Sequence, residues 1–283
     1  MRSITALLLL LCLLAPGARA EEPAYTYKTV QTTVTYDAET LRISIETCEI
    51  SGTKCYLTRV WMAEPARQIR KASSPFHEKL AKAETLAQKI PGAALVINGS
   101  GYVSPLYPDI PENYPGTSED YYYTPLGSVT VTDGTVLRKL DGVPYYGLTL
   151  EEDGLHMHVG EDPEAVLARN PSQTWSFYEG CPLILGGEDL LDREWPFARR
   201  KAIRTIICRM SAQEYLILTV TNVHGLGLTT CVDFLLGEIR PEWAYNLDGG
   251  PSSALFRRKQ GKRTLKLIFG AKQKIVDVMG FVE

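Results

Sequence analysis

Alternating apolar and polar positions dominate the chain after residue 26. In the second stretch, Leu41, Ile43 and Ile45 fall on one face. Alternation with a period of two residues is typical of half-buried strands. We therefore predict strands at residues 27–36, 40–50 and 55–63. The last two are joined at a turn over Ser51–Lys54, as in a β-hairpin.

A helical spacing replaces this alternation between residues 76 and 90. Apolar side chains recur there three or four positions apart, at Phe76, Leu80, Ala83, Leu86, Ala87 and Ile90. This spacing predicts an α-helix over 76–90, with Ser73 or Ser74 as its N-cap and Pro91–Gly92 as its end. The continuous apolar run 93–97 predicts a buried strand that ends at a loop.

The remaining chain alternates between short strands and short helices. Residues 104–127 have no periodicity and predict a long loop, whose tyrosines at 121–123 either line a sugar-sized cleft or pack the loop onto the body. Hairpins are predicted to turn at Asp133–Gly134 and Asp153–Gly154, and helices at 162–169 and 228–239. Further strands are predicted at 202–210, 215–221, 243–247, 254–256, 265–269 and 275–281. Because strands outnumber helices, we predict an α+β fold: one β-rich mixed-sheet domain with a few flanking helices.

Composition limits the functional classes. The chain has 283 residues, of which 45% are hydrophobic and 22% are charged, as in ordinary globular proteins. Its net charge is −3, from 30 basic and 33 acidic residues. Nucleic-acid binding depends on clustered basic residues that neutralise phosphates, so a mildly acidic chain without such clusters is not expected to bind nucleic acid.

The N-terminus has the features of an export signal. Arg2 is followed by the apolar run Leu7–Leu14, and Ala18-Arg19-Ala20 has the small-residue pattern of a cleavage site. The apolar run is about half of the roughly 20 residues that span a bilayer, so we predict a signal peptide over 1–20, cleaved after Ala20. The mature protein would then be secreted or associated with the cell envelope, with no stable membrane span. Residues 21–92 would form a β-rich segment and helix that pack on a main domain over 93–283.

Cysteines and histidines give no clear metal site. Removal of Cys12 leaves an odd number of five cysteines, and no C-x-x-C pair is present. Cys48 and Cys55 flank the first turn, so they either form a disulfide or remain buried thiols. His156 and His158 share one strand face, but no third ligand follows, which favours an exposed strand. We assign no metal and no cofactor, without excluding a divalent cation.

The segment 245–253 has the clearest chemical pattern. A predicted strand ends at Asp248, and Gly249 and Gly250 follow with no side chains. Such a turn allows backbone N–H groups to approach a ligand oxygen, and the hydroxyls of Ser252 and Ser253 can complete an anion cradle.

The run 246–253 resembles the Asn-Leu-Asp-Gly-Gly-Gly-Ser-Ser signature of the phosphodiester glycosidase family, in its bacterial exported branch. Three other segments resemble family segments in the family's order: Ile97-Asn98-Gly99, Gly180-Cys181-Pro182-Leu183-Ile184 and Arg204-Thr205-Ile206. The resemblance runs from about residue 93 to the C-terminus. Pro251 replaces the third glycine of the signature and removes one N–H from the cradle.

The resemblance implies hydrolysis of the bond between a sugar anomeric carbon and a phosphodiester oxygen, of the N-acetylglucosamine-1-phosphodiester type. Asp248 would activate water or stabilise the developing sugar cation. Arg204 would bind the phosphate with its fork of donors, and Asn98 would contact the sugar or the phosphate. The substrate is further expected to contact Gly99, Thr205, Gly249, Gly250, Ser252 and Ser253. Within that set, Thr205 and Ser253 fit structural hydrogen bonds better than chemistry.

Some assignments remain open in the sequence. The second carboxyl group that glycosidases normally use is not identified; Asp233, Glu179, Glu119 and Asp120 are candidates, and His224 is a candidate for the rim. The alternative function is a catalytically silent envelope protein that binds sugar phosphates or glycans on the same fold. A metal-dependent phosphodiesterase would need several more ligands near Asp248. Convergence of Asn98, Arg204 and Asp248 on one cleft would support a site of either kind.

Overall fold

The computed structural model describes residues 24–106, 108–222 and 224–283. The predicted signal peptide over 1–20 lies outside the described residues. Within the described ranges, no helix combines the length and the apolar character needed to cross a bilayer.

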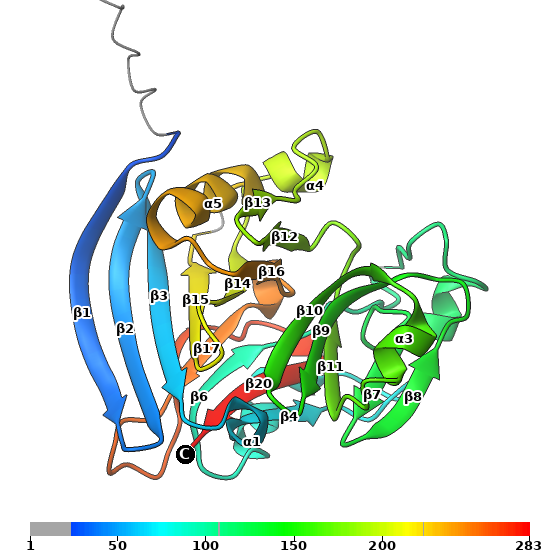
Figure 1. The fold of residues 1–283 in the computed structure, drawn as a ribbon, viewed down its shortest axis with the longest axis horizontal. Coiled ribbons are helices and arrows are strands. Elements are labelled where there is room, and N and C mark those ends of the chain that lie inside the picture. The colour runs from blue at the N-terminus through cyan, green and yellow to red at the C-terminus, as the bar shows by residue number, and fades with distance from the viewer. Residues whose placement is uncertain (1–23, 107, 223) are drawn as a thin grey trace, which may run out of the picture.

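The largest element is an eight-stranded antiparallel sheet in the order β1-β2-β3-β15-β14-β16-β12-β13 (Figure 1). Its strands are β1 Tyr27–Asp37, β2 Leu41–Ile50, β3 Thr53–Met62, β15 Glu214–Val220, β14 Arg204–Arg209, β16 Trp243–Asn246, β12 Pro182–Leu185 and β13 Glu188–Asp189. The three strands predicted first are therefore confirmed and form one side of this sheet. The β2–β3 turn is tighter than predicted, because Ser51 and Gly52 both have positive φ and form a two-residue hairpin loop.

Smaller sheets complete the body. A five-stranded sheet has the order β18-β17-β6-β20-β4, and a three-stranded sheet has the order β10-β9-β11. Their bounds are β4 Ile69–Ser73, β6 Ala93–Asn98, β17 Ala254–Arg257, β18 Lys266–Gly270, β20 Asp277–Val282, β9 Tyr145–Glu151, β10 Gly154–Glu161 and β11 Gln173–Ser176. The pairs β5–β19 and β7–β8 are β5 Ala81–Lys82, β19 Lys274–Ile275, β7 Val129–Thr132 and β8 Thr135–Lys139. Figure 1 shows β9, β10 and β11 beside β7, β8 and the short helix α3.

Helices are few and short. They are α1 Pro65–Gln68, α2 Ala83–Gln88, α3 Pro163–Leu167, α4 Pro196–Arg199 and α5 Leu228–Phe234, with the single turns η1 Ser118–Tyr121 and η3 Gly250–Ser252. The predicted helix 228–239 is confirmed as α5 continued by the π-helical turn η2 Leu235–Ile239. The β-rich α+β architecture predicted from the sequence is confirmed.

The eight-stranded sheet is covered on both faces, which explains its mostly buried central strands. On one face, Cys231 and Phe234 of α5 pack against Leu218 and other apolar side chains of β14 and β15. On the other face, Ile207 and Ile217 join Leu95, Met279 and Trp175 from the two smaller sheets in a continuous core. The chemistry-bearing strand ends lie where these sheets meet.

The predicted helix over 76–90 is largely wrong. Only Ala83–Gln88 is helical, and its N-cap is Lys82, not Ser73 or Ser74. The backbone of residues 81–82 pairs with β19 instead, which removes these groups from helical hydrogen bonding. The sequence pattern also missed β4, β11 and β12, which are too short for a clear period.

The structure also decides three further expectations from the sequence. His158 is buried rather than exposed, lying 2.7 Å from Thr149 Oγ1 and 3.0 Å from Glu161, so the exposed-strand interpretation is wrong for it. Cys48 and Cys55 are direct cross-strand partners, and both are free, buried thiols. The tyrosines at 121–123 do not line the large cavity described below, and Tyr121 packs into the loop.

Candidate active site

Asp248 lies at the meeting point of two sheets. It follows β16, whose end is fixed when Leu247 N–H donates to the carbonyl of Thr205 on β14 at 2.9 Å. The N–H of Asp248 donates to the carbonyl of Gly99, directly after β6 in the five-stranded sheet, at 3.1 Å. Backbone bonds to both sheets therefore determine where this carboxyl group is presented.

The side chain of Asn98 is hydrogen-bonded to the turn at Asp248. Its Nδ2 donates to the Asp248 carbonyl at 2.7 Å, and its Oδ1 accepts from Thr205 Oγ1 at 2.9 Å and from Ala254 N–H at 3.0 Å. Thr205 Oγ1 also lies 3.1 Å from Ser253 Oγ. All three side chains are fully buried and none lines the cavity. Asn98, Thr205 and Ser253 are thus brought to Asp248, but as a structural network beneath it.

The glycine turn does not present a free N–H cradle. Gly249 N–H donates to Oδ1 of Asp248 at 2.8 Å, and Gly250 N–H donates to the Ile203 carbonyl at 3.0 Å. Gly250 has φ +57°, which favours glycine, and a Cβ on Gly249 would lie 2.8 Å from the Ile203 carbonyl. The glycines are needed for this close turn, while their N–H groups are already used. Gly99 has the same kind of role, because a Cβ there would overlap Asp277.

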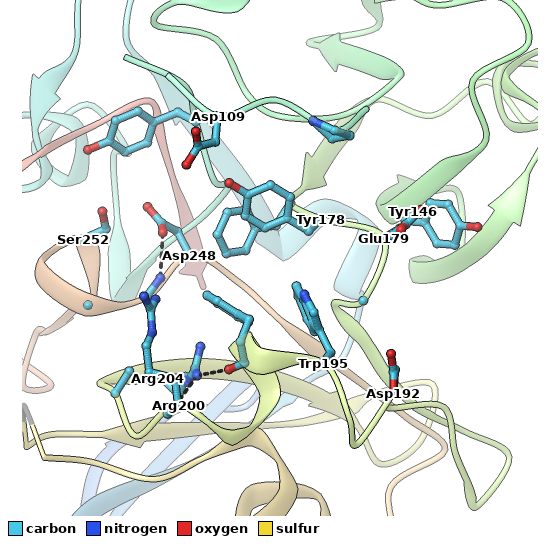
Figure 2. Close-up of a pocket in the computed structure, with 18 of the residues that line it drawn as sticks. Asp109, Tyr146, Tyr178, Glu179, Asp192, Trp195, Arg200, Arg204, Asp248 and Ser252 are labelled. Carbon is cyan, nitrogen blue, oxygen red and sulfur yellow. Dashed lines mark hydrogen bonds between the residues drawn. The ribbon is translucent and has the colours of Figure 1, made fainter. Parts of the chain in front are cut away.

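A cavity of about 1020 Å³ opens at Asp248. Such a volume is at the upper end for small-molecule sites. Figure 2 shows Asp248, Ser252, Arg200 and Arg204 toward one end and Glu179, Asp192, Trp195 and Tyr146 toward the other. The lining also includes Tyr102, Asp109, Glu112, Phe177, Tyr178, Phe197, Gly249, Gly250, Pro251 and Gln273.

The Asp248 carboxyl group is a much weaker acid than an ordinary aspartate. Its pKa is raised to about 7, mainly by removal from water, and the charge of Asp277 acts in the same direction. Hydrogen bonds from Ser252 and from Gly249 N–H act in the opposite direction, because they stabilise the ionised form. Ser252 in turn accepts a bond from Gln273 Nε2 at 2.6 Å. A carboxyl group with this pKa can accept or release a proton near neutral pH.

Arg204 reaches the cavity from β14 but is 1% exposed. Its Nη2 donates to the carbonyls of Phe197 and Arg200, both at 2.8 Å, and its guanidinium carbon lies 4.3 Å from the Phe197 ring centre. The pKa of Arg204 is lowered to about 10, mainly by burial, and the charge of Arg200 acts in the same direction. Neither arginine forms an ion pair with a described carboxylate.

Aromatic side chains form a wall of the cavity. Phe177 stacks on Tyr178 with ring centres 4.5 Å apart, and Trp195 lies 4.7 Å from Phe197. Burial raises the pKa of Tyr178 to about 12, aided by the charges of Asp109 and Asp248, so its phenol stays protonated. Apolar ring faces beside polar groups suit a sugar, which has both.

Of the carboxyl candidates from sequence, Glu179 lines the cavity. Asp233 is instead paired with Arg193 at 2.6 Å, and Asp120 caps the η1 turn with Thr117. Neither these two nor Glu119 and His224 belong to the lining. Asp109, Glu112 and Asp192 are additional acidic residues that the sequence pattern did not indicate.

Comparison with known proteins identifies the family. A family profile described as phosphodiester glycosidase matches residues 91–282, more than half of the chain. The chain belongs to the phosphodiester glycosidase family. This confirms the resemblance seen in the sequence motifs. None of the curated proteins compared with the chain matches it.

Solved structures support the same fold. The catalytic domain of zebrafish N-acetylglucosamine-1-phosphodiester α-N-acetylglucosaminidase, auto-inhibited by its pro-peptide, is 16% identical with a TM-score of 0.59. The match covers 93% of this chain and 85% of that one. A hypothetical protein from Synechocystis is 14% identical with a TM-score of 0.56, covering 90% of this chain and 64% of the other. At these identities the likeness shows the fold.

This member of the family has cavity residues that sequence reasoning missed. The aromatic wall and Arg200 come from two segments, 177–180 and 192–202, and the second contains the four-residue helix α4. The only local signal was the density of aromatic residues at Phe177-Tyr178 and Trp195-Pro196-Phe197. Gly180 begins one of the family-like segments, but the aromatic residues and Arg200 belong to no motif or period, so only the fold reveals that both segments line one space.

Proposed function

We propose that this protein hydrolyses sugar-1-phosphodiesters, releasing a free sugar and a phosphomonoester. The observation that carries the proposal is the Asp248 carboxyl group, with a pKa of about 7, in a cavity whose same end holds two arginines without carboxylate partners. Family membership makes this chemistry the natural use of such a site. The zebrafish relative's name states an N-acetylglucosamine-1-phosphodiester, which we take as the substrate type to test.

The reaction follows from the charges at that end. A water molecule attacks the anomeric carbon, and the ionised Asp248 carboxylate accepts the water's proton. The bond from the anomeric carbon to the bridging oxygen breaks, and its electron pair leaves with the phosphate. The phosphomonoester is a stable anion, so it needs positive charge nearby more than it needs a proton donor. The arginine end supplies that charge, and the aromatic wall positions the sugar.

Product analysis in water enriched in ¹⁸O tests this proposal. The purified protein would be given N-acetylglucosamine α-1-(methyl phosphate), and the products read by mass spectrometry. Glycosidic cleavage places the label on the anomeric hydroxyl of free sugar. Attack of water at phosphorus would instead place the label on the phosphate, giving either sugar 1-phosphate and methanol or unlabelled free sugar and methyl phosphate. Either outcome would contradict the proposal. Glu119→Gln, an exposed carboxyl outside the cavity, is a matched control for Asp248→Asn.

One observation favours the binding-only alternative. The N–H groups of Gly249 and Gly250 are already bonded within the protein, and Pro251 has none. A cavity with this turn can bind a sugar phosphate without stabilising a transition state through the backbone. Tight binding of the same diester, with no product after prolonged incubation, would support this alternative over hydrolysis.

We also propose that the protein is exported. The support is the sequence pattern of residues 1–20 described above. Mass spectrometry of the protein isolated from its host should find an N-terminus at Glu21. An intact Met1 in the mature protein would contradict export by cleavage after Ala20.

A further inference from the structure

The two arginines at the Asp248 end differ in how much of their bonding capacity is already used. Arg204 is almost completely buried, and both protons of its Nη2 are engaged by the Phe197 and Arg200 carbonyls. Its guanidinium group also packs on the Phe197 ring. A side chain held in this way has little surface left for a ligand.

Arg200 has the opposite character. It is exposed, it lines the same cavity, and its side chain has no hydrogen bond or ion pair to a described residue. Its guanidinium carbon lies 5.2 Å from the Phe197 ring centre, so both cations lie against the same ring. Among the described residues that line the cavity, these two are the basic ones.

We infer that Arg200 makes the direct contact with the phosphate of the substrate, and that Arg204 is a positioning residue that fixes the backbone carrying Arg200. The inference rests on the proposed function and changes the role that the sequence motif suggested for Arg204.

The backbone contacts explain how the positioning works. Arg200 follows the four-residue helix α4, and its N–H donates to the Pro196 carbonyl at 3.1 Å. The carbonyl of Arg200 itself accepts from Arg204 Nη2, so the buried guanidinium holds the residue that presents the exposed one. The adjacent positive charge makes an anion between Arg200 and Asp248 more favourable, because neither arginine is neutralised by a carboxylate.

The planar guanidinium of Arg200 suits the two non-bridging oxygens of a phosphodiester, which accept parallel N–H bonds. Ser252 and Gln273 lie at the same end of the cavity but are already bonded to each other. The Nε of Arg204 also lacks a partner, but it is buried, so Arg200 is the arginine that presents exposed free donors at the place where the leaving phosphate must lie.

The test compares four arginine variants on N-acetylglucosamine α-1-(methyl phosphate). Loss of a hydrogen bond to a charged group costs enough to lower kcat/KM of Arg200→Ala roughly 10- to 100-fold. The melting temperature should stay at the wild-type value, and added guanidinium chloride at millimolar concentration should restore part of the rate. Arg199→Ala is the matched control, because Arg199 is a neighbouring exposed arginine bonded to Glu194 outside the cavity.

Arg204→Ala should behave differently. Its melting temperature should fall, because two carbonyls lose their donor, and guanidinium should not restore activity. Unchanged kcat/KM in Arg200→Ala, together with loss in a stably folded Arg204→Lys, would overturn the inference while leaving the proposed function intact.

If the wild-type protein shows no turnover, the proposed function fails, and calorimetric binding of the same diester decides the inference. Binding that is lost in Arg200→Ala and kept in Arg199→Ala supports the phosphate contact. Equal binding by all variants, or none by the wild type, refutes it.

Discussion

Two aspartates lie close together where the sheets meet, and the structure treats them in opposite ways. Asp277, at the start of β20, is fully buried; Lys71 Nζ lies 3.3 Å from it, and it accepts bonds from the N–H and hydroxyl of Ser100 at 2.7 and 2.8 Å. Asp248, at the end of β16, faces the cavity with bonds only from neutral groups, Gly249 N–H and Ser252. Lys71 also donates to the Thr174 carbonyl, so the first aspartate is part of a closed network.

The surroundings of each aspartate explain why one has a structural role and the other a reactive one. A buried carboxylate that has a lysine partner and full hydrogen bonding has a structural role and is not available for chemistry. A carboxyl group removed from water without a contacting cation keeps a proton to higher pH, and its reactivity is available to a ligand. The negative charge of Asp277 contributes to this state of Asp248.

The largest expected effect is the loss of catalysis when Asp248 is replaced. Asp248→Asn keeps the size of the side chain but cannot accept a proton from water. We expect kcat/KM to fall about 10³-fold, within the range for loss of a general base. Steady-state kinetics on the methyl phosphodiester measure this, with Glu119→Gln expected at the wild-type rate. Activity within threefold of wild type would show that Asp248 is not the base.

The second prediction concerns Lys71. Lys71→Met leaves Asp277 buried without its cation, and breaking a buried pair costs about 3–5 kcal/mol in the free energy of unfolding. Urea denaturation measures the loss. Lys89→Met, at an exposed lysine, should be neutral. If Lys71→Met were as stable as Lys89→Met, the buried Lys71–Asp277 pair would not contribute to the stability of the fold.

The third prediction is a pH-dependent gain of stability in Asp248→Asn. The folded-state pKa of about 7 lies above the unfolded value of 3.8, so the native protein binds more protons between these values. Its unfolding free energy therefore falls as pH rises through this window. Asparagine removes this penalty, so the variant should be more stable than wild type by about 1–3 kcal/mol at pH 8 and equal to it near pH 3.5. An equal difference at both pH values would contradict the raised pKa.

The smallest effect is expected for Ser252→Ala. The Ser252 hydroxyl lowers the pKa of Asp248, so its removal should raise that pKa. Because the ionised form is the base, kcat/KM of the wild type should decline below about pH 7, and the variant's decline should begin at higher pH. A decline that moves to lower pH would show that this hydrogen bond raises the pKa of Asp248 and does not lower it.

Local pattern predicted much of the fold. Alternation predicted β1, β2 and β3, and the Asp133 and Asp153 turns each join two strands as expected. The helical spacing over 76–90 failed because residues 81–82 pair with β19, nearly 200 positions away, and no local signal reports such a partner. Elements of four residues, such as β11 and β12, show too little of a period to be recognised.

The chemical groups of the site follow from the amino-acid sequence: the motif around Asp248, the resemblance to the family, and the residues that meet behind the glycine turn. How each of these residues is used depends on tertiary packing. Asn98 and Arg204 are internal supports because both are buried and donate to backbone carbonyls of other segments, Asn98 Nδ2 to Asp248 and Arg204 Nη2 to Phe197 and Arg200. Arg200 and the aromatic wall came to the cavity from segments without periodicity, since exposure and free hydrogen-bonding capacity depend on which distant strands pack together.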